Sequence, residues 1–317
     1  MKKKEQVQEP NIQEVADVEA VPVSEQNIVF KPNVGPQTDF LAAGEREVLY
    51  GGSAGGGKSY AMLADPLRYM GHPSFSGLLL RHTTEELREL IYKSKEIYPQ
   101  IWKGIKWSER KMQWEAPSGA RLWMSYLDRE DDVLRYQGLA FSWIGFDELT
   151  QWASPYAWNY MRSRLRSVAS DLPVYMRATT NPGGPGHQWV KKMFIDPAPY
   201  GRQFDATDIE SGNILSYPKG HTKAGQPLFK RRFIPARLSD NPYLAETGDY
   251  ETMLLSLPEH QRKQLLEGDW DIKEGAAFSE FDRNIHVIEP FSIPRNWVKF
   301  RACDYGYGSY SGVLWFA

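Results

Sequence analysis

The chain has 317 residues, of which 41% are hydrophobic and 25% are charged, and its formal net charge is −2. These ordinary globular values exclude collagen-like, coiled-coil and wholly disordered chains, and the length predicts about two domains. Cys303 is the only cysteine, so disulfide frameworks and cysteine-rich zinc sites are excluded and a reducing cytosol is favoured. We expect no membrane partner, because no apolar run approaches the ~18 residues of a membrane span and the N-terminus lacks the apolar core of a signal peptide.

The first elements follow a polar N-terminal segment. Residues 1–27 contain scattered charge, two prolines and no aromatic residue, so they bury too little apolar surface to fold and predict a disordered tail. From residue 28 onward, apolar segments alternate with segments of helical spacing. Expected strands cover 46–50, 77–81, 141–146 and 174–179, expected helices cover 59–70 and 83–98 (with Thr83 or Thr84 as the cap of the second), and a hairpin is expected over 107–127.

Strands separated by helices are typical of the α/β class and predict a mostly parallel, doubly wound sheet with helices on both faces. Residues 183–240 are rich in Gly, Pro and polar groups and predict no clear elements. Residues 241–268 predict two short helices broken at Pro258, and the last two expected strands cover 297–304 and 312–317.

The most specific motif is a Gly-rich loop between an expected strand and an expected helix. In that loop, backbone N–H groups surround the β-phosphate of a nucleotide, and the following helix points its positive end at the anion. Lys58 is expected to reach the β- and γ-phosphates of ATP, and Ser59 to bind Mg²⁺. The residues that match the phosphate-binding pattern G-x-x-x-x-G-K-[ST] are Gly52, Ser53, Ala54, Gly55, Gly56, Gly57, Lys58 and Ser59.

A pair of acids follows the buried strand expected at 141–146. Acids at the carboxyl end of a parallel strand lie where ligands bind. Asp147 is expected to orient Mg²⁺ or its water, and Glu148 to position and deprotonate the attacking water. Along the chain, the two acids come after the Gly-rich loop, which is the order expected for these two motifs in an ATP hydrolase.

Two further polar segments fit the same site. The strand expected at 174–179 runs into Thr180 and Asn181, whose hydroxyl and amide groups are expected to sense the γ-phosphate. Upstream of the loop, Gln37 is expected to contact the edge of adenine. The alternatives are an ordinary Asn-Pro turn at 181–182 and a polar loop residue at position 37.

Hydrolysis of ATP also needs a cation that balances charge in the transition state. Arg135 and the run Arg162, Arg164 and Arg166 are candidates, although such a run is also typical of a solvated basic surface. Because the net charge is near zero, contacts with DNA must come from local basic groups, and 191–192 and 230–232 are candidates for contacting phosphates.

Together these motifs resemble the large terminase subunit of tailed double-stranded DNA phages, the ATPase that packages DNA into procapsids. The resemblance extends over about residues 36–310. The segments that carry it are 52–59, 136–138, 144–150, 163–166, 180–184, 186–187, 189–190, 240–243 and 268–270.

The resemblance implies three parts and several partners. The parts are an additional-strand P-loop ATPase core at 28–200, a linker subdomain and connection at 201–295, and the first strands of an RNase H-like nuclease domain at 296–317. The implied partners are double-stranded DNA, a small terminase subunit, and the portal of a procapsid. The chain is expected to assemble into a homo-oligomeric ring and to act in the host cell cytoplasm.

The resemblance also implies an arginine finger supplied by a neighbouring subunit of the ring. We favour Arg135, which lies just before the acidic strand, although Tyr136-Gln137-Gly138 departs from the Arg-Gly of some relatives. The other implied roles are Gln37 at adenine, Asp147 at Mg²⁺, Glu148 as the base, and 179–181 as the segment that couples hydrolysis to movement.

Asp304 matches a metal-binding carboxylate of the first nuclease strand in this family. Two-metal hydrolysis needs several carboxylates, yet only 13 residues follow Asp304 and none is acidic. We therefore expect a chain that stops early in the nuclease domain, so that its nuclease site is incomplete unless the missing part is supplied.

Two other functions remain open. An ATP-dependent helicase or remodelling translocase would separate strands, whereas a packaging motor moves intact duplex. A non-catalytic fragment, left unfolded or inert by its interrupted nuclease domain, would show no cooperative thermal transition.

Overall fold

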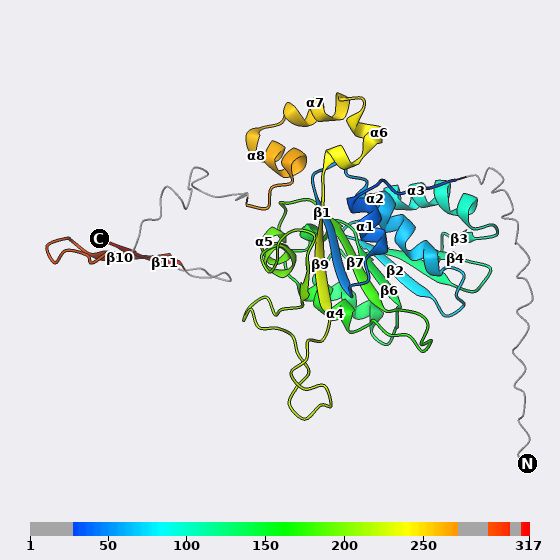
Figure 1. Ribbon diagram of the computed structural model, residues 1–317, viewed down its shortest axis with the longest axis horizontal. Helices are drawn as coiled ribbons and strands as arrows, with labels where there is room; N and C mark the ends of the chain where they lie inside the picture. Colours follow the sequence, from blue (N-terminus) through cyan, green and yellow to red (C-terminus); the bar gives the residue numbers. More distant parts are fainter. Residues whose placement is uncertain (1–27, 272–290, 305–311) are drawn as a thin grey trace, which may run out of the picture. The chain divides into compact units, whose positions relative to one another are not determined.

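The computed structural model describes residues 28–271, 291–304 and 312–317 (Figure 1), so the tail expected at 1–27 lies outside the described residues. The chain divides into two compact units, one ending at residue 272 and the other starting at residue 273. Among the described helices, none is both long enough and apolar enough to cross a membrane.

A nine-stranded sheet forms the centre of the first unit (Figure 1). Neighbouring strands pair in parallel from β5 to β9, and β3, β4 and β8 add antiparallel edges. This confirms the predicted α/β fold with a mostly parallel sheet. In order across the sheet, the strands are β3 (Lys106–Ser108), β4 (Gln113–Glu115), β5 (Arg121–Tyr126), β2 (Ser76–Arg81), β6 (Trp143–Phe146), β7 (Tyr175–Thr180), β1 (Glu47–Gly52), β9 (Lys230–Ala236) and β8 (Gln203–Asp205).

Strand β7 lies between β1 and β6. One additional strand therefore separates the Gly-rich loop after β1 from the acids after β6. Leu49 of β1 lies opposite Ala178 of β7, which also pairs with Phe146 of β6. Because parallel strands end at the same edge of a sheet, the polar residues that follow all three strands gather at one edge.

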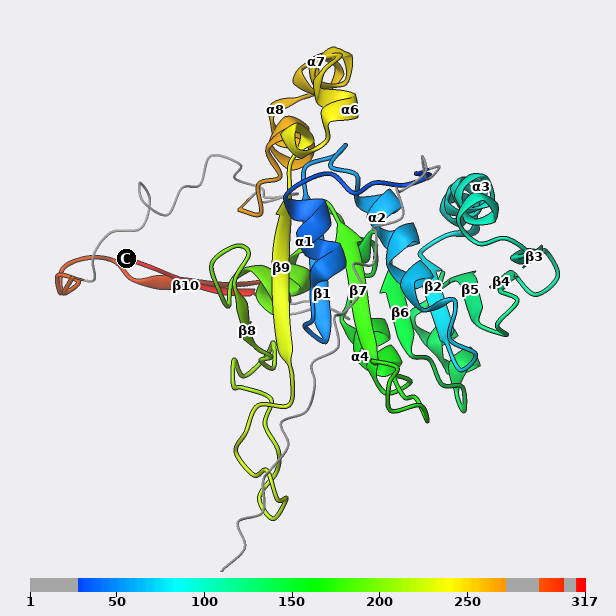
Figure 2. The same ribbon diagram turned by 45° about the vertical axis from the view of Figure 1, so that its right-hand side comes forward.

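Helices cover both faces of the sheet (Figure 2). Helices α1 (Pro36–Ala42), α2 (Lys58–Ala64) and α3 (Thr84–Ile101) pack on one face, and α4 (Tyr156–Arg162) and α5 (His187–Val190) pack on the other. Strand residues alternate between the two faces, so Leu79 of β2 joins the core under α2 and α3 whereas Leu78 and Leu80 join the core under α4 and α5.

Helix α3 begins at a capping box. The Thr83 hydroxyl accepts a hydrogen bond from the Glu86 N–H (3.3 Å), and the Glu86 carboxylate accepts one from the Thr83 N–H (3.4 Å). We expect Thr83→Ala to lower the free energy of unfolding by about 1 kcal/mol in urea denaturation. Thr84→Ala is the matched control, because the Thr84 hydroxyl makes no hydrogen bond within the described residues. Equal losses in the two variants would contradict the assignment of Thr83 as the cap.

A buried carboxylate ties β1 to its neighbours. Glu47 is fully buried, and its oxygens pair with Arg231 of β9 (2.7 Å to Nε) and with Arg162 of α4. Burial by itself raises the pKa of Glu47, but the two guanidinium groups hold that pKa below its ordinary value. Arg231 is only 1% exposed, so its interpretation as a DNA-contacting residue is wrong: it balances the charge of Glu47 in the core.

The sheet extends beyond residue 200, where we expected the ATPase core to end. Strand β9 pairs in parallel along the whole of β1, from Arg231 opposite Glu47 to Ala236 opposite Gly52. The pattern of 183–240 hides this strand, because β9 contains Pro235 and three consecutive basic residues at its start.

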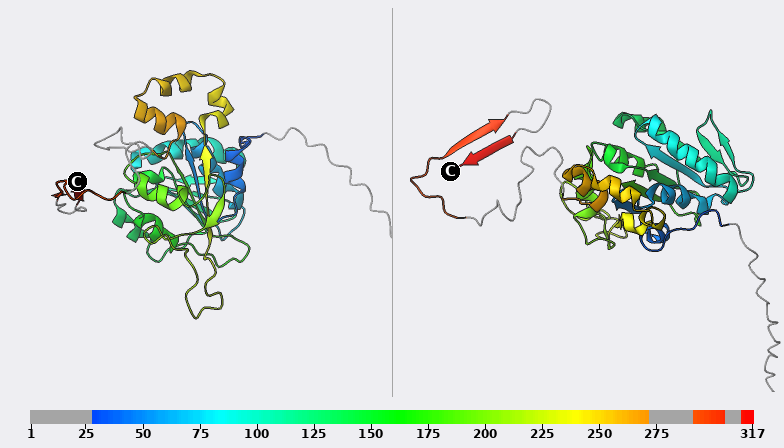
Figure 3. Two further views of the ribbon diagram at one scale, coloured as in Figure 1. Left: turned by 60° about the vertical axis from the view of Figure 1, so that its left-hand side comes forward. Right: turned by 90° about the horizontal axis from the view of Figure 1, so that it is seen from above.

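Short helices follow β9, and we call residues 242–267 the α6–α8 segment. Figure 3 shows these helices gathered beyond the sheet of the first unit. Pro258 lies between α7 and α8, which confirms the predicted break, but two helices, α6 and α7, precede it where one was expected. The segment contains α6 (Pro242–Ala245), α7 (Asp249–Leu255), α8 (Glu259–Arg262) and a final turn at Lys263–Glu267.

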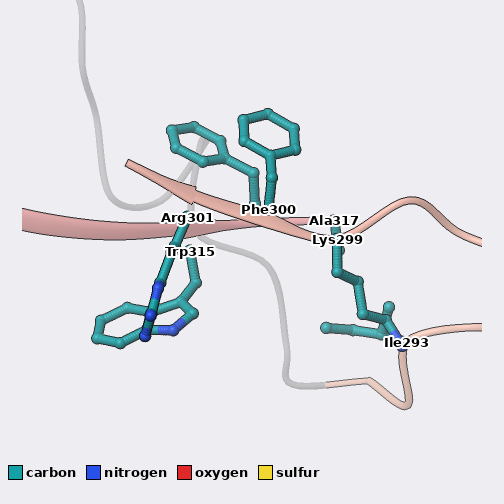
Figure 4. Close-up of a pocket in the computed structure, with 7 residues that line it drawn as sticks. Ile293, Lys299, Phe300, Arg301, Trp315 and Ala317 are labelled. Atoms are coloured by element: carbon teal, nitrogen blue, oxygen red, sulfur yellow. The ribbon is translucent and has the colours of Figure 1, made fainter. Parts of the chain in front are cut away.

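The described part of the second unit contains an antiparallel hairpin of β10 (Phe300–Asp304) and β11 (Gly312–Phe316), close to the two predicted strands. The rings of Phe300 and Phe316 stack with their centroids 4.7 Å apart, and a pocket of about 420 Å³ opens beside them (Figure 4). Trp315 of the same hairpin is 75% exposed. The hairpin therefore leaves large apolar side chains uncovered within the described residues.

Candidate active site

The Gly-rich loop joins β1 to α2, as predicted. Four of its backbone carbonyl groups accept hydrogen bonds from side chains. Asn241 and Gln37 reach it from other elements, whereas Tyr50 and Lys58 flank it in sequence. Each of these side chains fixes one carbonyl group in direction. The four hydrogen bonds are Lys58 Nζ to Ser53 O (2.7 Å), Asn241 Nδ2 to Gly55 O (2.6 Å), Tyr50 OH to Gly56 O (2.7 Å) and Gln37 Nε2 to Gly57 O (2.8 Å).

The loop amides divide into two groups. The Ser53 N–H donates to Ala236 O (2.8 Å) and the Ala54 N–H to Leu265 O (2.6 Å), which anchors the start of the loop. The amides of 55–59 make no hydrogen bond to other described residues. A run of free amides with its carbonyls held away is an anion-binding concavity.

Glycine is required at the start of this loop. Gly52 has φ +139°, and a Cβ there would lie 2.3 Å from the Ala236 carbonyl oxygen. Only a residue without a side chain allows β1 to approach β9 this closely and then turn into the loop.

Lys58 lies at the centre of the site. Its ammonium group donates to Asn181 Oδ1 (2.7 Å) as well as to the loop, and the residue is 7% exposed. Burial lowers the pKa of Lys58, and the negative charges of Glu148 and Asp147 act in the opposite direction. The structure thus brings the loop lysine, both acids and Asn181 together, as the sequence predicts.

Asp147 is held on both sides. It is 1% exposed, one carboxylate oxygen accepts a hydrogen bond from the Thr179 hydroxyl, and the other lies 3.0 Å from Arg81 Nε. Its backbone N–H donates to Leu80 O (2.9 Å). These contacts fix the carboxylate at the edge of the sheet.

Glu148 has an unusual backbone and an unusual charge environment. Its φ is +59°, in the left-handed region that an L-residue rarely adopts. Burial raises the pKa of Glu148, with a further increase from Asp147, while Lys58 and Arg81 lower it. A carboxylate with a raised pKa is suited to accept a proton from water.

A hydroxyl network links the acids to the segment after β7. The Thr150 and Thr180 hydroxyls lie 2.7 Å apart, and Thr150 also donates to Asn181 O (3.2 Å). The Gly186 N–H donates to the Thr150 carbonyl (2.7 Å). The turn after β6 contains both Glu148 and Thr150. Through the hydrogen bonds of Thr150, this turn is connected to Thr180 and Asn181, which were expected to sense the γ-phosphate.

A profile of the family described as "Terminase large subunit, T4likevirus-type, N-terminal" matches residues 49–285. This match includes the loop, the acids and the α6–α8 segment. The chain belongs to this terminase family.

Solved structures of the large terminase of one thermophilic bacteriophage share the fold of this terminase. The large terminase of a thermophilic bacteriophage is 17% identical, with a TM-score of 0.55, and the match covers 90% of this chain and 65% of that chain. The same protein in complex with ADP gives a TM-score of 0.53 at 17% identity with the same coverage. A weaker match, with a TM-score of 0.47 at 13% identity, is to the ATPase domain of the Thermus phage P74-26 large terminase, over 76% of this chain and 94% of that chain.

The terminase described here thus spans just under two thirds of the length of the first relatives, at 65%. A search of curated proteins found no match to it.

Gln37 lies against the loop of this terminase rather than free in solution. It is 3% exposed, its amide group donates to Gly57 O, and its carbonyl oxygen accepts from the Asn33 N–H (2.7 Å). These contacts brace the loop. The role of Gln37 at adenine stays a prediction.

The arginines weighed from the sequence are engaged away from the acids. Arg162 pairs with Glu47 at the start of β1, the strand end opposite the loop, so it does not bring its charge to the acids of its own chain. Arg166 donates to Gly138 O (2.8 Å). Arg135 donates to Tyr126 O (2.7 Å) and lies above the Tyr126 ring. Arg135 is exposed, and its role as a finger in a neighbouring subunit stays a prediction.

Asp304 is the last residue of β10, and all five residues of this strand are exposed. Among the described residues, no group of three or more His, Cys, Asp or Glu side chains is placed to hold a metal ion. The role of Asp304 at a nuclease metal also stays a prediction.

Sequence reasoning gave no role to three residues that the fold brings to this site, Arg81, Thr150 and Asn241, although the segments 144–150 and 240–243 of the resemblance include the last two. Arg81 directly follows the apolar run of a predicted strand, which is the one signal that could have placed it at the ligand-binding edge. Asn241 is 186 positions from Gly55, so no local pattern connects the two.

Proposed function

We propose that this terminase chain hydrolyses ATP as the motor subunit that moves double-stranded viral DNA into a procapsid. One observation carries the proposal: the free amides of 55–59 and the buried ammonium of Lys58 lie beside Asp147 and Glu148. Phosphates bind to such an amide concavity, and a carboxylate beside it can activate water.

ATP phosphates would compete with Ser53 and Asn181 for the three N–H donors of Lys58. Glu148 would take a proton from the attacking water onto its carboxylate. Asn181 would then lose its hydrogen bond with Lys58 and bond to another partner. The hydrogen bond between the Thr150 and Thr180 hydroxyls would transmit the resulting movement of Asn181 to the turn after β6. The coupling role of 179–181 rests on this network.

Two oxygen groups fit Mg²⁺. The Ser59 hydroxyl makes no hydrogen bond within the described residues, and Asp147 Oδ2, which faces Arg81 Nε at 3.0 Å, accepts no hydrogen bond there either. Hydroxyl and carboxylate oxygens are the donors that Mg²⁺ prefers. When bound with ATP, Mg²⁺ would neutralise part of the phosphate charge, while Ser59 and Asp147 hold it directly or through water.

The further assignments rest on family membership. We propose double-stranded DNA, a small terminase subunit and a portal or procapsid as partners, with a homo-oligomeric ring as the working state in the host cell cytoplasm. We likewise propose the ATPase core at 28–200 together with strand β9, the linker within 201–295, and the start of a nuclease domain at 296–317.

ATPase assays of the purified chain, with and without duplex DNA, test this function. We expect duplex DNA to stimulate turnover and Lys58→Ala to abolish it, because alanine removes the ammonium group that would contact the phosphates. Lys103→Ala, at an exposed position, is the control and should retain wild-type turnover. Nucleotide binding that Lys58→Ala leaves intact would contradict the site.

The same samples separate the alternatives. Strand separation of a labelled duplex would favour a helicase over a packaging motor. A chain without a cooperative thermal transition and without nucleotide binding would favour an inert fragment.

A further inference from the structure

Arg81 places a positive charge beside Asp147 and Glu148. It lies on β2, a strand that contains none of the sequence motifs described above. It is the last residue of β2, and Leu80 before it lies opposite Phe146 of β6. Arg81 and Asp147 therefore leave neighbouring strands side by side, with Arg81 Nε 3.0 Å from Asp147 Oδ2. The register of β2 against β6, rather than a loop, fixes this position, and Figure 2 shows these two strands side by side in the sheet.

The geometry leaves Arg81 able to bind a ligand. Arg81 Nε and Asp147 Oδ2 attract each other through charge, but both atoms are buried without a hydrogen bond. The terminal nitrogens of Arg81 make no hydrogen bond within the described part of the chain, and the side chain is 14% exposed. The guanidinium is thus anchored at one nitrogen and open at the other two, a fork that fits phosphate oxygens.

Arg81 also acts on Glu148. Its positive charge opposes the burial that raises the pKa of Glu148, as does the charge of Lys58. The two cations thus approach the acids from different elements, Lys58 from the loop and Arg81 from β2. The arginines suggested by the sequence are held elsewhere, Arg162 by Glu47 and Arg135 by the Tyr126 carbonyl.

We propose that Arg81 supplies, within the same chain, the cation that binds the γ-phosphoryl oxygens during ATP hydrolysis. This rests on the proposed function. In the reaction, the water oxygen forms a bond to the γ-phosphorus while a water proton passes to Glu148. The bond from the γ-phosphorus to the bridging oxygen breaks, and its electron pair stays on ADP. Arg81 stabilises the charge on the γ-phosphoryl oxygens during this transfer, so it recognises ATP and the transition state but not ADP.

The first test compares nucleotide affinity and turnover in Arg81→Ala, Arg81→Lys and the control Arg121→Ala, which lies at the exposed start of β5. We expect Arg81→Ala to lower kcat by about 100-fold or more. Its ADP affinity should stay at the wild-type value in a fluorescent-nucleotide titration, while its affinity for a non-hydrolysable ATP analogue falls to that for ADP. Arg81→Lys keeps the positive charge but loses the forked geometry of the guanidinium. Its kcat and its affinity for the ATP analogue should therefore lie between those of wild type and those of Arg81→Ala.

Two results of the nucleotide titrations would overturn this role. One is an Arg81→Ala protein that distinguishes the ATP analogue from ADP as well as wild type does. The other is a drop in ADP affinity equal to the drop in analogue affinity, which would assign Arg81 to the general shape of the site. A wild-type protein that binds no nucleotide would overturn the proposed function together with this inference, whereas normal Arg81→Ala turnover overturns the inference alone.

A mixing experiment tests the same-chain assignment. Arg81→Ala subunits carry an intact loop, and Lys58→Ala subunits carry an intact Arg81. If Arg81 serves its own chain, no site in the mixture is complete and ATPase activity stays at the level of the separate variants. Recovery of activity on mixing would show that Arg81 serves a neighbouring subunit, which contradicts the proposal.

Discussion

Glu148→Gln should bind ATP with near wild-type affinity yet hydrolyse it about 10²–10⁴-fold more slowly. The glutamine keeps the size of the side chain but cannot accept the proton of the attacking water. Phosphate binding is preserved, because the loop amides and Lys58 are untouched. Steady-state turnover and a fluorescent-nucleotide titration on the same sample measure the two quantities.

The pH dependence provides a second readout of Glu148. Its pKa is raised, first by burial, so the carboxylate form that acts as a base is lost at a higher pH than for an ordinary glutamate. We expect wild-type turnover to fall as the pH drops through this raised pKa, and this acidic limb to be absent from the residual activity of Glu148→Gln. Glu210→Gln, at an exposed position, is the control. Near-normal turnover of Glu148→Gln would exclude its role as the base.

The second large effect concerns stability. Glu47→Ala should lower the free energy of unfolding by about 3–5 kcal/mol, because it leaves the buried guanidinium of Arg231 without a counter-charge. Urea denaturation followed by far-ultraviolet circular dichroism measures the change. Glu259→Ala removes an exposed partner of Lys263 and should leave the urea midpoint unchanged. Equal midpoints for wild type and Glu47→Ala would show that the buried pair contributes nothing.

The contribution of Glu47 should also depend on pH. Because the folded-state pKa of Glu47 lies below its ordinary value, its stabilising effect is fully present above the unfolded-state pKa. The effect is lost as the pH falls through the lower, folded-state pKa. The stability difference between wild type and Glu47→Ala should therefore shrink in acid, and a difference that grows in acid would contradict this charge assignment.

Local patterns were sufficient for the parts of the site that are continuous in sequence. The Gly-rich loop, the acids after β6 and the segment after β7 each follow an apolar strand, and parallel strands place such ends together. The same reasoning reached the fold class, because strands and helices alternate along the chain.

Other contacts depend on which strands become neighbours. Nothing near Glu47 in sequence indicates that its charge is balanced by Arg231, 184 positions away. A basic run at 230–232 resembles a solvated surface until β9 is known to pair with β1. The same limit applies to Arg81, whose partner Asp147 is adjacent only because β2 lies beside β6.

The four side chains that hold the loop carbonyls also affect the thermodynamics of nucleotide binding. These hydrogen bonds restrict the loop before a ligand arrives, so less conformational entropy is lost when a phosphate enters than for an unrestrained loop. Two residues that bond to the loop lie in or next to the α6–α8 segment: Asn241 donates to the Gly55 carbonyl, and the Leu265 carbonyl accepts from the Ala54 N–H. A shift of that segment must therefore change the affinity of the loop for nucleotide. By thermodynamic reciprocity, a bound nucleotide must bias the position of that segment by the same free energy.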